Sequence, residues 1–284
     1  MIEFRNITYN YNSGDAAEYA ALRSLSLKIE KGEFIGIAGH TGSGKSTAAQ
    51  IAAGLINPTS GKILIDGKQF ESAAETAREL RKRVGIVFQY PEHQLFEETV
   101  YRDIAFAPKN RGLGAEEADE CVRRSAALAG VGEELFEKSP FELSGGQKRR
   151  VAIAGVLAAN PSVLILDEPA AGLDPAGRRK LLSLLRKIHA EASTSIILIS
   201  HSMEDLAENA GRIVILGGGE KLADDIPENI FTNGELLKKS GLDMPEITKT
   251  VQLLRRGGME LDNRIFTVSD AAKAIAKAAG VIKC

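Results

Sequence analysis

The sequence predicts an α/β fold with a mostly parallel core sheet, an antiparallel β subdomain, a helical insert and a helical C-terminal tail. Short runs of Val, Ile and Leu, the longest at residues 163–166 and 196–199, indicate strands buried on both faces. Helix-type segments separate these runs, and such alternation is typical of parallel sheets with crossover helices. At 284 residues, 44% of them hydrophobic, the chain can bury a large core.

The elements are expected in the following order. Up to about residue 67 the pattern is mostly strand-like, and from about residue 73 Glu, Arg, Lys and Ala dominate. Strands are predicted near residues 2–9 and at 25–29, 34–38, 63–65, 84–89, 163–166 and 196–200, and helices at 46–55, 115–130, 146–160 and 175–192. The residues after Gly217–Gly219 have an amphipathic pattern and are predicted to be helical. We therefore expect one domain at 1–225, with a helical insert at about 90–160, and a tail at 226–284.

Composition excludes several functional classes. With 36 Lys and Arg against 38 Asp and Glu, the net charge of −2 argues against an electrostatic nucleic-acid binder. Cys121 and Cys284 form no disulfide framework, and neither has the Cys or His neighbours that a metal site needs. No apolar run approaches the ~20 residues of a membrane-spanning helix, and the first residues lack a signal-peptide layout. We expect a protein that does not cross a bilayer by itself.

A glycine-rich loop follows the strand at 34–38 and precedes a helix, in the pattern G-x-x-x-x-G-K-[ST]. Consecutive N–H groups in such a loop, together with the positive end of the helix dipole, bind phosphate. Lys45 would reach the β- and γ-phosphates, and the Ser46 hydroxyl would ligate Mg²⁺. The alternative is a tight strand–helix turn without a ligand. The loop and the start of the helix comprise Gly39, His40, Thr41, Gly42, Ser43, Gly44, Lys45, Ser46 and Thr47.

Two carboxylates follow the buried strand at 163–166. Asp167 and Glu168 stand where that strand meets the carboxyl edge of the sheet, the edge at which ligands bind in open α/β folds. Asp167 is placed to hold Mg²⁺, directly or through water, and Glu168 could accept a proton from an attacking water.

A third motif, Leu143 followed by Ser144, Gly145, Gly146 and Gln147, begins a predicted helix shortly before the two acids. A serine and two glycines at a helix start offer a second anion site, although they could also serve only as a helix cap. Together with the phosphate loop and the acids, this pentapeptide resembles the signature of the ATP-binding-cassette (ABC) superfamily of P-loop ATPases. The resemblance implies ATP and Mg²⁺ as cofactors and covers about residues 1–225.

The resemblance assigns roles to further residues. Gln89 matches the glutamine that contacts Mg²⁺ and the attacking water, and His201 matches the histidine that contacts the γ-phosphate. Tyr11 falls where the family places an aromatic ring against adenine, although it could be a strand-edge tyrosine. The loop at 171–174 matches the segment that crosses between two cassettes, but it lacks the hydroxyl residue that the family often carries there. Catalytic roles are thus implied for Lys45, Gln89, Glu168 and His201, and metal contacts for Ser46, Gln89 and Asp167.

The segment from Phe88 to Asn110 narrows the class. It resembles the ATPase component of energy-coupling-factor importers, including the cobalt and nickel type, which take up vitamins or transition-metal ions. The tail resembles the segment that helps to hold two such ATPases together. Tyr90, Leu95, Phe96 and Val100 would form an exposed apolar patch for a partner helix, unless they pack within the insert.

The implied function is the ATP-hydrolysing subunit of a membrane importer, peripheral at the cytoplasmic face of the cell membrane. Its implied partners are a second ATPase, a multispanning coupling protein and a substrate-binding membrane protein, with no nucleic acid. The family binds ATP between residues 39–46 of one chain and 144–147 of another. Alternatives are another ABC importer or exporter, a soluble ABC protein acting on ribosomes or DNA, or a P-loop metabolite kinase, which would have no use for residues 143–147.

The remaining polar features are expected to be passive. His93 and His189 are interpreted as surface or packing residues, and the basic runs at 81–83 and 148–150 as solvated helix faces.

Overall fold

A computed structural model of the protein describes residues 1–11 and 19–280. Its core is a six-stranded sheet in which five strands run parallel and one edge strand is antiparallel. The strands are, in sheet order, β10 (Glu220–Asp225), β9 (Arg212–Gly217), β3 (Phe34–Ala38), β8 (Ser195–Ile199), β7 (Val163–Asp167) and β6 (Val84–Val87). Every residue of β3, β7 and β8 is buried, as the unbroken apolar runs predict. The predicted α/β class is confirmed.

A second sheet covers one side of the first and is entirely antiparallel. Its strands are β2 (Tyr19–Ile29), β1 (Ile2–Tyr11), β4 (Ser60–Ile65) and β5 (Lys68–Gln69). Helix α1 (Lys45–Ala52) shares a hydrophobic core with both sheets, in which Ile7, Ile51 and Ile35 are fully buried. This core fixes the phosphate loop between the two sheets. Helix α2 (Ala73–Arg83) packs against β4 and β6.

The second core lies on the opposite face of the parallel sheet, under α6 (Pro175–Ala192) and α7 (Met203–Asn209). Asp174 caps α6 by accepting a hydrogen bond from the N–H of Gly177, and Pro175 stands at the first position of the helix. Leu181, Leu185 and other residues at helical spacing then face the sheet. The cap places the end of the loop at 171–174 next to the acids that follow β7.

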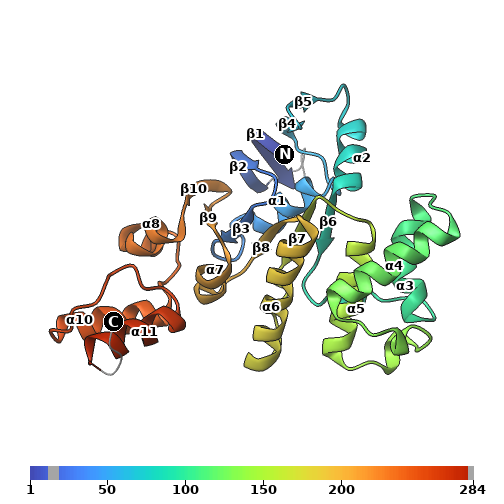
Figure 1. Ribbon diagram of the computed structural model, residues 1–284. Helices are drawn as coiled ribbons and strands as arrows, with labels where there is room; N and C mark the ends of the chain where they lie inside the picture. The colour runs from blue at the N-terminus through green and yellow to red at the C-terminus, as the bar shows by residue number, and fades with distance from the viewer. Residues whose placement is uncertain (12–18, 281–284) are drawn as a thin grey trace.

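Three helices form a separate body to one side of the sheets, drawn in green in Figure 1. They are α3 (Val100–Asn110), α4 (Ala115–Ala129) and α5 (Gly145–Ala158), and short 3₁₀-helices accompany them at Pro91–Gln94, Glu133–Leu135 and Pro140–Glu142. They enclose their own hydrophobic core, which includes Ile104, Val122 and Val151.

The C-terminal part begins with a strand, which corrects the expectation of helix directly after Gly219. β10 pairs with β9 through a turn at Gly218 and Gly219, both of which have positive φ. Helices α8 (Pro227–Thr232), α9 (Gly234–Lys239), α10 (Glu246–Arg256) and α11 (Val268–Ala278) follow. Figure 1 shows α10 and α11 on the side of the molecule away from α3–α5. Among the described helices, none combines the length and apolar character that crossing a membrane would require.

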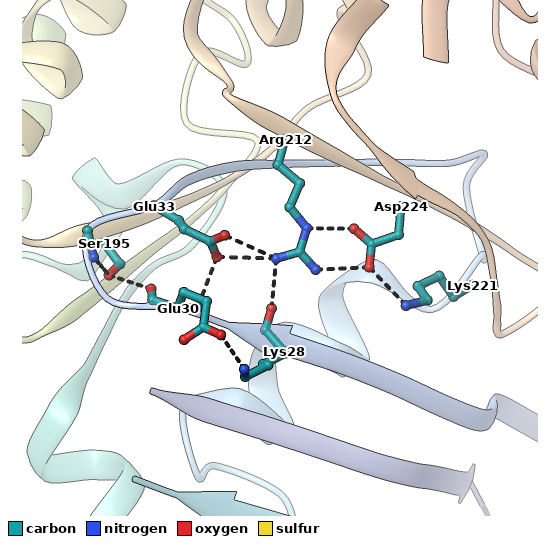
Figure 2. A network of polar contacts seen from close by, with 8 residues as sticks. Lys28, Glu30, Glu33, Ser195, Arg212, Lys221 and Asp224 are labelled. Carbon is teal, nitrogen blue, oxygen red and sulfur yellow. Dashed lines mark hydrogen bonds and ion pairs between the residues drawn. The ribbon is translucent and has the colours of Figure 1, made fainter. Parts of the chain in front are cut away.

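A polar network ties the β9–β10 hairpin to the turn between β2 and β3 (Figure 2). Arg212 donates two hydrogen bonds to Asp224, at 2.6 and 2.9 Å, two to Glu33, both at 3.2 Å, and one to the carbonyl of Lys28 at 3.0 Å. Lys221 adds an ion pair with Asp224 at 2.8 Å. The strand that leads into the C-terminal helices is therefore fixed to the central sheet by a guanidinium whose hydrogen bonds reach three residues.

Candidate nucleotide site

The phosphate loop runs from β3 into α1 with a geometry that needs glycine. A Cβ atom at Gly39 would lie 2.2 Å from the carbonyl oxygen of Leu216 on β9. At Gly44, where φ is 100°, a Cβ atom would lie 2.5 Å from the carbonyl oxygen of Ala21 on β2. The loop is thus pressed between the two sheets, and α1 begins at the next residue, Lys45.

Lys45 is buried at the base of this loop. Its Nζ donates hydrogen bonds to the carbonyls of Gly39 at 2.7 Å and His40 at 2.9 Å. Burial lowers the pKa of Lys45, and the nearby negative charges of Glu168 and Asp167 partly oppose that effect. The ammonium group therefore lies within a ring of acceptors, at the point where the loop faces the two acids.

Glu168 follows β7 in a left-handed backbone conformation, with φ at 49°. Burial, and then the charge of Asp167, raise its pKa to about 7, against the opposing charge of Lys45. His201 follows the adjacent strand β8, and its Nε2 lies 3.2 Å from Glu168 Oε1. Burial, and then the charge of Lys45, lower the pKa of His201. The site therefore holds a neutral imidazole beside a carboxyl group that titrates near neutral pH.

These groups border one open cavity of about 560 Å³. The parallel register of β3, β8 and β7 explains the convergence, because their carboxyl ends meet at one edge of the sheet. The predicted residues that line the cavity are Tyr11, Thr41, Gly42, Gly44, Lys45, Ser46, Thr47, Gln89, Asp167, Glu168 and His201. The Tyr11 hydroxyl lies 3.3 Å from Thr47 Oγ1, which places the tyrosine at the end of the cavity that adjoins α1.

Sequence reasoning missed Tyr19, which also lines the cavity. Its hydroxyl donates a hydrogen bond to the carbonyl of Gly42 at 3.1 Å, and in the β1–β2 register it stands opposite Tyr11. The signal was available, because a second tyrosine near the start of the antiparallel partner strand faces the same site. Ala21 and Ala171 complete the lining of the cavity, and a methyl side chain gives sequence reasoning no reason to assign either residue to a site.

Seven of the predicted site residues do not line this cavity. Gly39 and Ser43 are buried within the loop, and the side chain of His40 is exposed. Ser144 caps α5, because its hydroxyl accepts a hydrogen bond from the N–H of Gln147 at 3.4 Å; the same hydroxyl donates to Gln147 Oε1 at 2.9 Å. Gly145 and Gly146 are exposed at the helix start. None of the residues at 144–147 lines the described cavity around Lys45.

Three expectations from the sequence are wrong. The strand that precedes Gln89 ends at Val87, so Gln89 lies in a bend, exposed toward the cavity. Leu95 and Val100 are buried in the core of α3–α5, whereas Tyr90 and Phe96 are exposed. Arg149, expected on a solvated face, is only 4% exposed. In the last two cases the local pattern is apolar or basic, but contacts with distant segments decide which side chains are buried.

Comparison with known proteins places this geometry in a family. Residues 22–171 match the ABC transporter family. An energy-coupling factor transporter ATP-binding protein, EcfA2 of Caldanaerobacter subterraneus subspecies tengcongensis, is 46% identical over 274 residues, which is 96% of each chain.

The chain is an ABC ATPase of the energy-coupling factor class. As a member of this family it binds and hydrolyses ATP.

Two solved structures are similar to this ATPase. The first, CbiO1 from Clostridium perfringens, is described as part of the ABC transporter complex CbiONQ; it is 35% identical, with a TM-score of 0.75 over 89% of this chain and 98% of that one. The second is a dimeric, post-hydrolysis structure of the ATP-binding cassette MJ0796 bound to ADP and Pi. It is 30% identical, with a TM-score of 0.69 over 80% of this chain and 99% of that one.

Proposed function

We propose that this ATPase powers an importer of vitamins or transition-metal ions, with ATP bound between two ATPase chains. The observation that carries the proposal is that the two sequence motifs assigned to nucleotide binding lie apart in one chain. One lines the cavity around Lys45, and the other forms the exposed helix start at Ser144. Since neither surface encloses ATP alone, a second copy or a related chain would supply the missing half. The dimeric structure reported for MJ0796 supports this arrangement.

In the proposed site, each residue binds, orients or accepts a proton. The Lys45 ammonium would exchange its carbonyl partners for the β- and γ-phosphates, while loop N–H groups and the start of α1 hold the same oxygens. Glu168 would accept the proton of the attacking water, because its pKa of about 7 leaves it largely ionised at slightly alkaline pH. His201 would donate to the γ-phosphate, and Tyr11 would contact adenine.

The residues fit Mg²⁺. Asp167, Ser46 and Gln89 offer a carboxylate, a hydroxyl and an amide oxygen at the border of the cavity, and hard cations prefer oxygen ligands. Within the described residues, Glu168 Oε1 is buried and lies 3.2 Å from His201 Nε2, but that contact lacks hydrogen-bond geometry, so the oxygen remains an acceptor for a water molecule of the site. Across residues 1–11 and 19–280, no group of three or more His, Cys, Asp and Glu could hold a metal ion. A bound Mg²⁺ would therefore share phosphate oxygens and water, and it would neutralise negative charge on the phosphates.

The membrane partner would dock beside α3. Phe96 and Phe106 are 59% and 43% exposed, and their rings meet edge to face at 4.9 Å. Together with Val151 and Val156 of α5 they line a hollow of about 200 Å³. A short helix from a cytoplasmic loop of a multispanning protein fits such an apolar hollow, which lies a few residues from Gln89. This docking would hold the ATPase at the cytoplasmic face of the membrane, next to a substrate-binding membrane protein.

The C-terminal helices would add to the contact between the two ATPases. Val251 of α10, Ala271 of α11 and Ile265 of the segment between them form a small core, while Leu253 and Val268 are 64% and 62% exposed. Exposed apolar side chains on a body at the side of the cassette are suited to a contact with a second chain.

Affinity purification from detergent-solubilised membranes tests the transporter assignment. We expect a multispanning membrane protein to be recovered with the wild type, and to be lost with Phe96→Ser while basal ATP hydrolysis is retained. Leu55→Ser changes a comparably exposed residue after α1 and serves as the control. Recovery of ribosomes or DNA without a membrane protein would overturn the proposal.

A further inference from the structure

Arg149 lies in the first turns of α5, two residues after Gln147, and its side chain is 5% exposed. A buried guanidinium is costly unless all of its donors are used. Nε and Nη2 bind both carboxylate oxygens of Glu92, at 2.9–3.1 Å. Nη1 donates to the carbonyl of Pro169 at 2.8 Å, and both Nη atoms lie 3.3 Å from the carbonyl of Ala171. The charge of Arg149 is therefore satisfied by two separate loops.

These two loops carry residues of the nucleotide site. Glu92 belongs to the 3₁₀-helix at Pro91–Gln94 and stands three residues after Gln89. Pro169 and Ala171 follow Glu168, and Ala171 itself lines the cavity. Burial alone would raise the pKa of Glu92, but the Arg149 guanidinium holds that pKa below its ordinary value, so both partners stay charged. One side chain of α5 thus fixes the positions of the loops on either side of the site.

We propose that Arg149 is a positioning residue that links the signature segment 144–147 to Gln89 and Glu168 of the same chain. The proposal rests on the composite site described above, in which residues 144–147 contact ATP held by the second chain. When that contact moves α5, Arg149 moves with it. Through Glu92 and the carbonyls of residues 169 and 171, the movement reaches the hydrolytic groups of its own cavity. Each site thereby senses whether the other is occupied.

The guanidinium suits this role better than an ammonium group would. Its planar fork holds a carboxylate with two parallel bonds while other donors reach carbonyls in the same plane. Lysine at this position keeps the charge but can hold only one of the two loops firmly. A displacement of about 1 Å in a catalytic group can lower the rate by about 100-fold. Arg149→Lys is therefore a sharp test, because it preserves charge and much of the volume.

The test compares Arg149→Lys, Glu92→Gln and the double variant by steady-state ATP hydrolysis, with circular dichroism and thermal unfolding to confirm folding. We expect kcat to fall about 10- to 100-fold in each, while the KM for ATP stays within about 2-fold because the phosphate loop is untouched. The double variant should be no slower than Arg149→Lys alone, since both changes break one linkage. The exposed pair formed by Arg102 on α3 and Glu98 just before that helix supplies the controls Arg102→Lys and Glu98→Gln.

Unchanged kcat in folded Arg149→Lys and Glu92→Gln, or losses that simply add in the double variant, would overturn the proposal. Loss of ATP hydrolysis only in proportion to loss of folded protein would do the same. If ATP is not shared between two chains, a different measurement on the wild type would reveal it. Specific activity would then be independent of protein concentration, whereas a site shared by two chains requires it to rise until the dimer is saturated.

Discussion

Replacing Glu168 with glutamine tests the electrostatics of the site most directly. The side chain is 19% exposed, and burial together with Asp167 raises its pKa from the ordinary 4.5 to about 7. Ionised Glu168 therefore destabilises the folded protein by about 3 kcal/mol relative to a neutral side chain. The folded-state pKa lies above the unfolded one, so the penalty is nearly absent at pH 4, grows between 4.5 and 7, and is complete above 7. Glutamine keeps the shape and removes the charge.

Thermal unfolding at two pH values measures this effect. At pH 8 we expect Glu168→Gln to be more stable than the wild type by about 3 kcal/mol, or about 6 °C in Tm. At pH 5 the gain should fall below about 1 kcal/mol, because the wild-type carboxyl group is then protonated. Glu208→Gln, an exposed change on α7, should alter stability at neither pH. Equal stability of Glu168→Gln and the wild type at pH 8 would refute the desolvation argument.

The same substitution tests Glu168 as the base. Steady-state ATP hydrolysis should fall by at least about 100-fold, while ATP binding persists and an ATP-bound dimer accumulates. In the wild type, kcat should rise with pH through about 7, as Glu168 loses its proton. Undiminished hydrolysis by Glu168→Gln would exclude it as the base. Because stability and rate respond in opposite directions, misfolding cannot imitate the expected pair of results.

The remaining predictions concern three other side chains. Lys45→Ala should weaken binding of a fluorescent ATP analogue by about 10- to 100-fold, since a charge-assisted hydrogen bond is lost; an unchanged Kd would remove Lys45 from the phosphate site. Tyr11→Ala should weaken the same binding by about 1–2 kcal/mol through lost base stacking, and equal affinity would leave Tyr11 as a strand-edge residue. Arg212→Gln should lower the free energy of unfolding by about 1–3 kcal/mol, because Asp224 and Glu33 lose their shared partner. Chemical denaturation measures this change, with Arg5→Gln, which breaks an exposed ion pair, as the control. A loss of unfolding free energy in Arg212→Gln no larger than in Arg5→Gln would contradict the prediction.

The central sheet could be predicted because its strands are identified by local sequence alone. β3 was expected at residues 34–38 and spans Phe34–Ala38, and the helix expected at 175–192 is α6, Pro175–Ala192. Strands buried on both faces are continuously apolar, and none of the described helices contains a run of Val, Ile and Leu as long as those of β7 and β8. Parallel topology then determines that the phosphate loop, the acids and His201 meet at one edge.

β10 was missed because its signal lies in the turn and not in the strand. Residues 220–225 are largely charged, and their amphipathic pattern also suits a helix. Gly218 and Gly219 supply two consecutive positive φ angles, which is the requirement for a tight hairpin after β9. The network around Arg212 then stabilises the pairing through residues far apart in the sequence, and no local pattern reveals such contacts (Figure 2).

The interpretation of Arg149 as part of a solvated helix face was wrong for a similar reason. Three consecutive basic residues at 148–150 suggest a solvated face, but α5 packs against the loop that carries Glu92 and so turns one of the three inward. The partners of that arginine come from segments 57 and about 20 residues away in the sequence. Only the tertiary arrangement brings them together.

The buried guanidinium of Arg149 therefore connects the three proposed functions of this ATPase, which are contact with the ATP of the second chain, docking of the membrane partner and hydrolysis. Glu92 stands between Gln89 and the docking hollow at Phe96, Arg149 stands behind the signature segment, and Pro169 follows the base. A membrane partner that displaces the segment at 90–96 would act on the same ion pair as ATP bound at residues 144–147. Hydrolysis would then be fastest with both contacts in place, because each contact would act on the carbonyls of residues 169 and 171 that Arg149 holds beside Glu168. On this argument, the geometry that positions the base would also hold hydrolysis that is not coupled to transport at a slow basal rate.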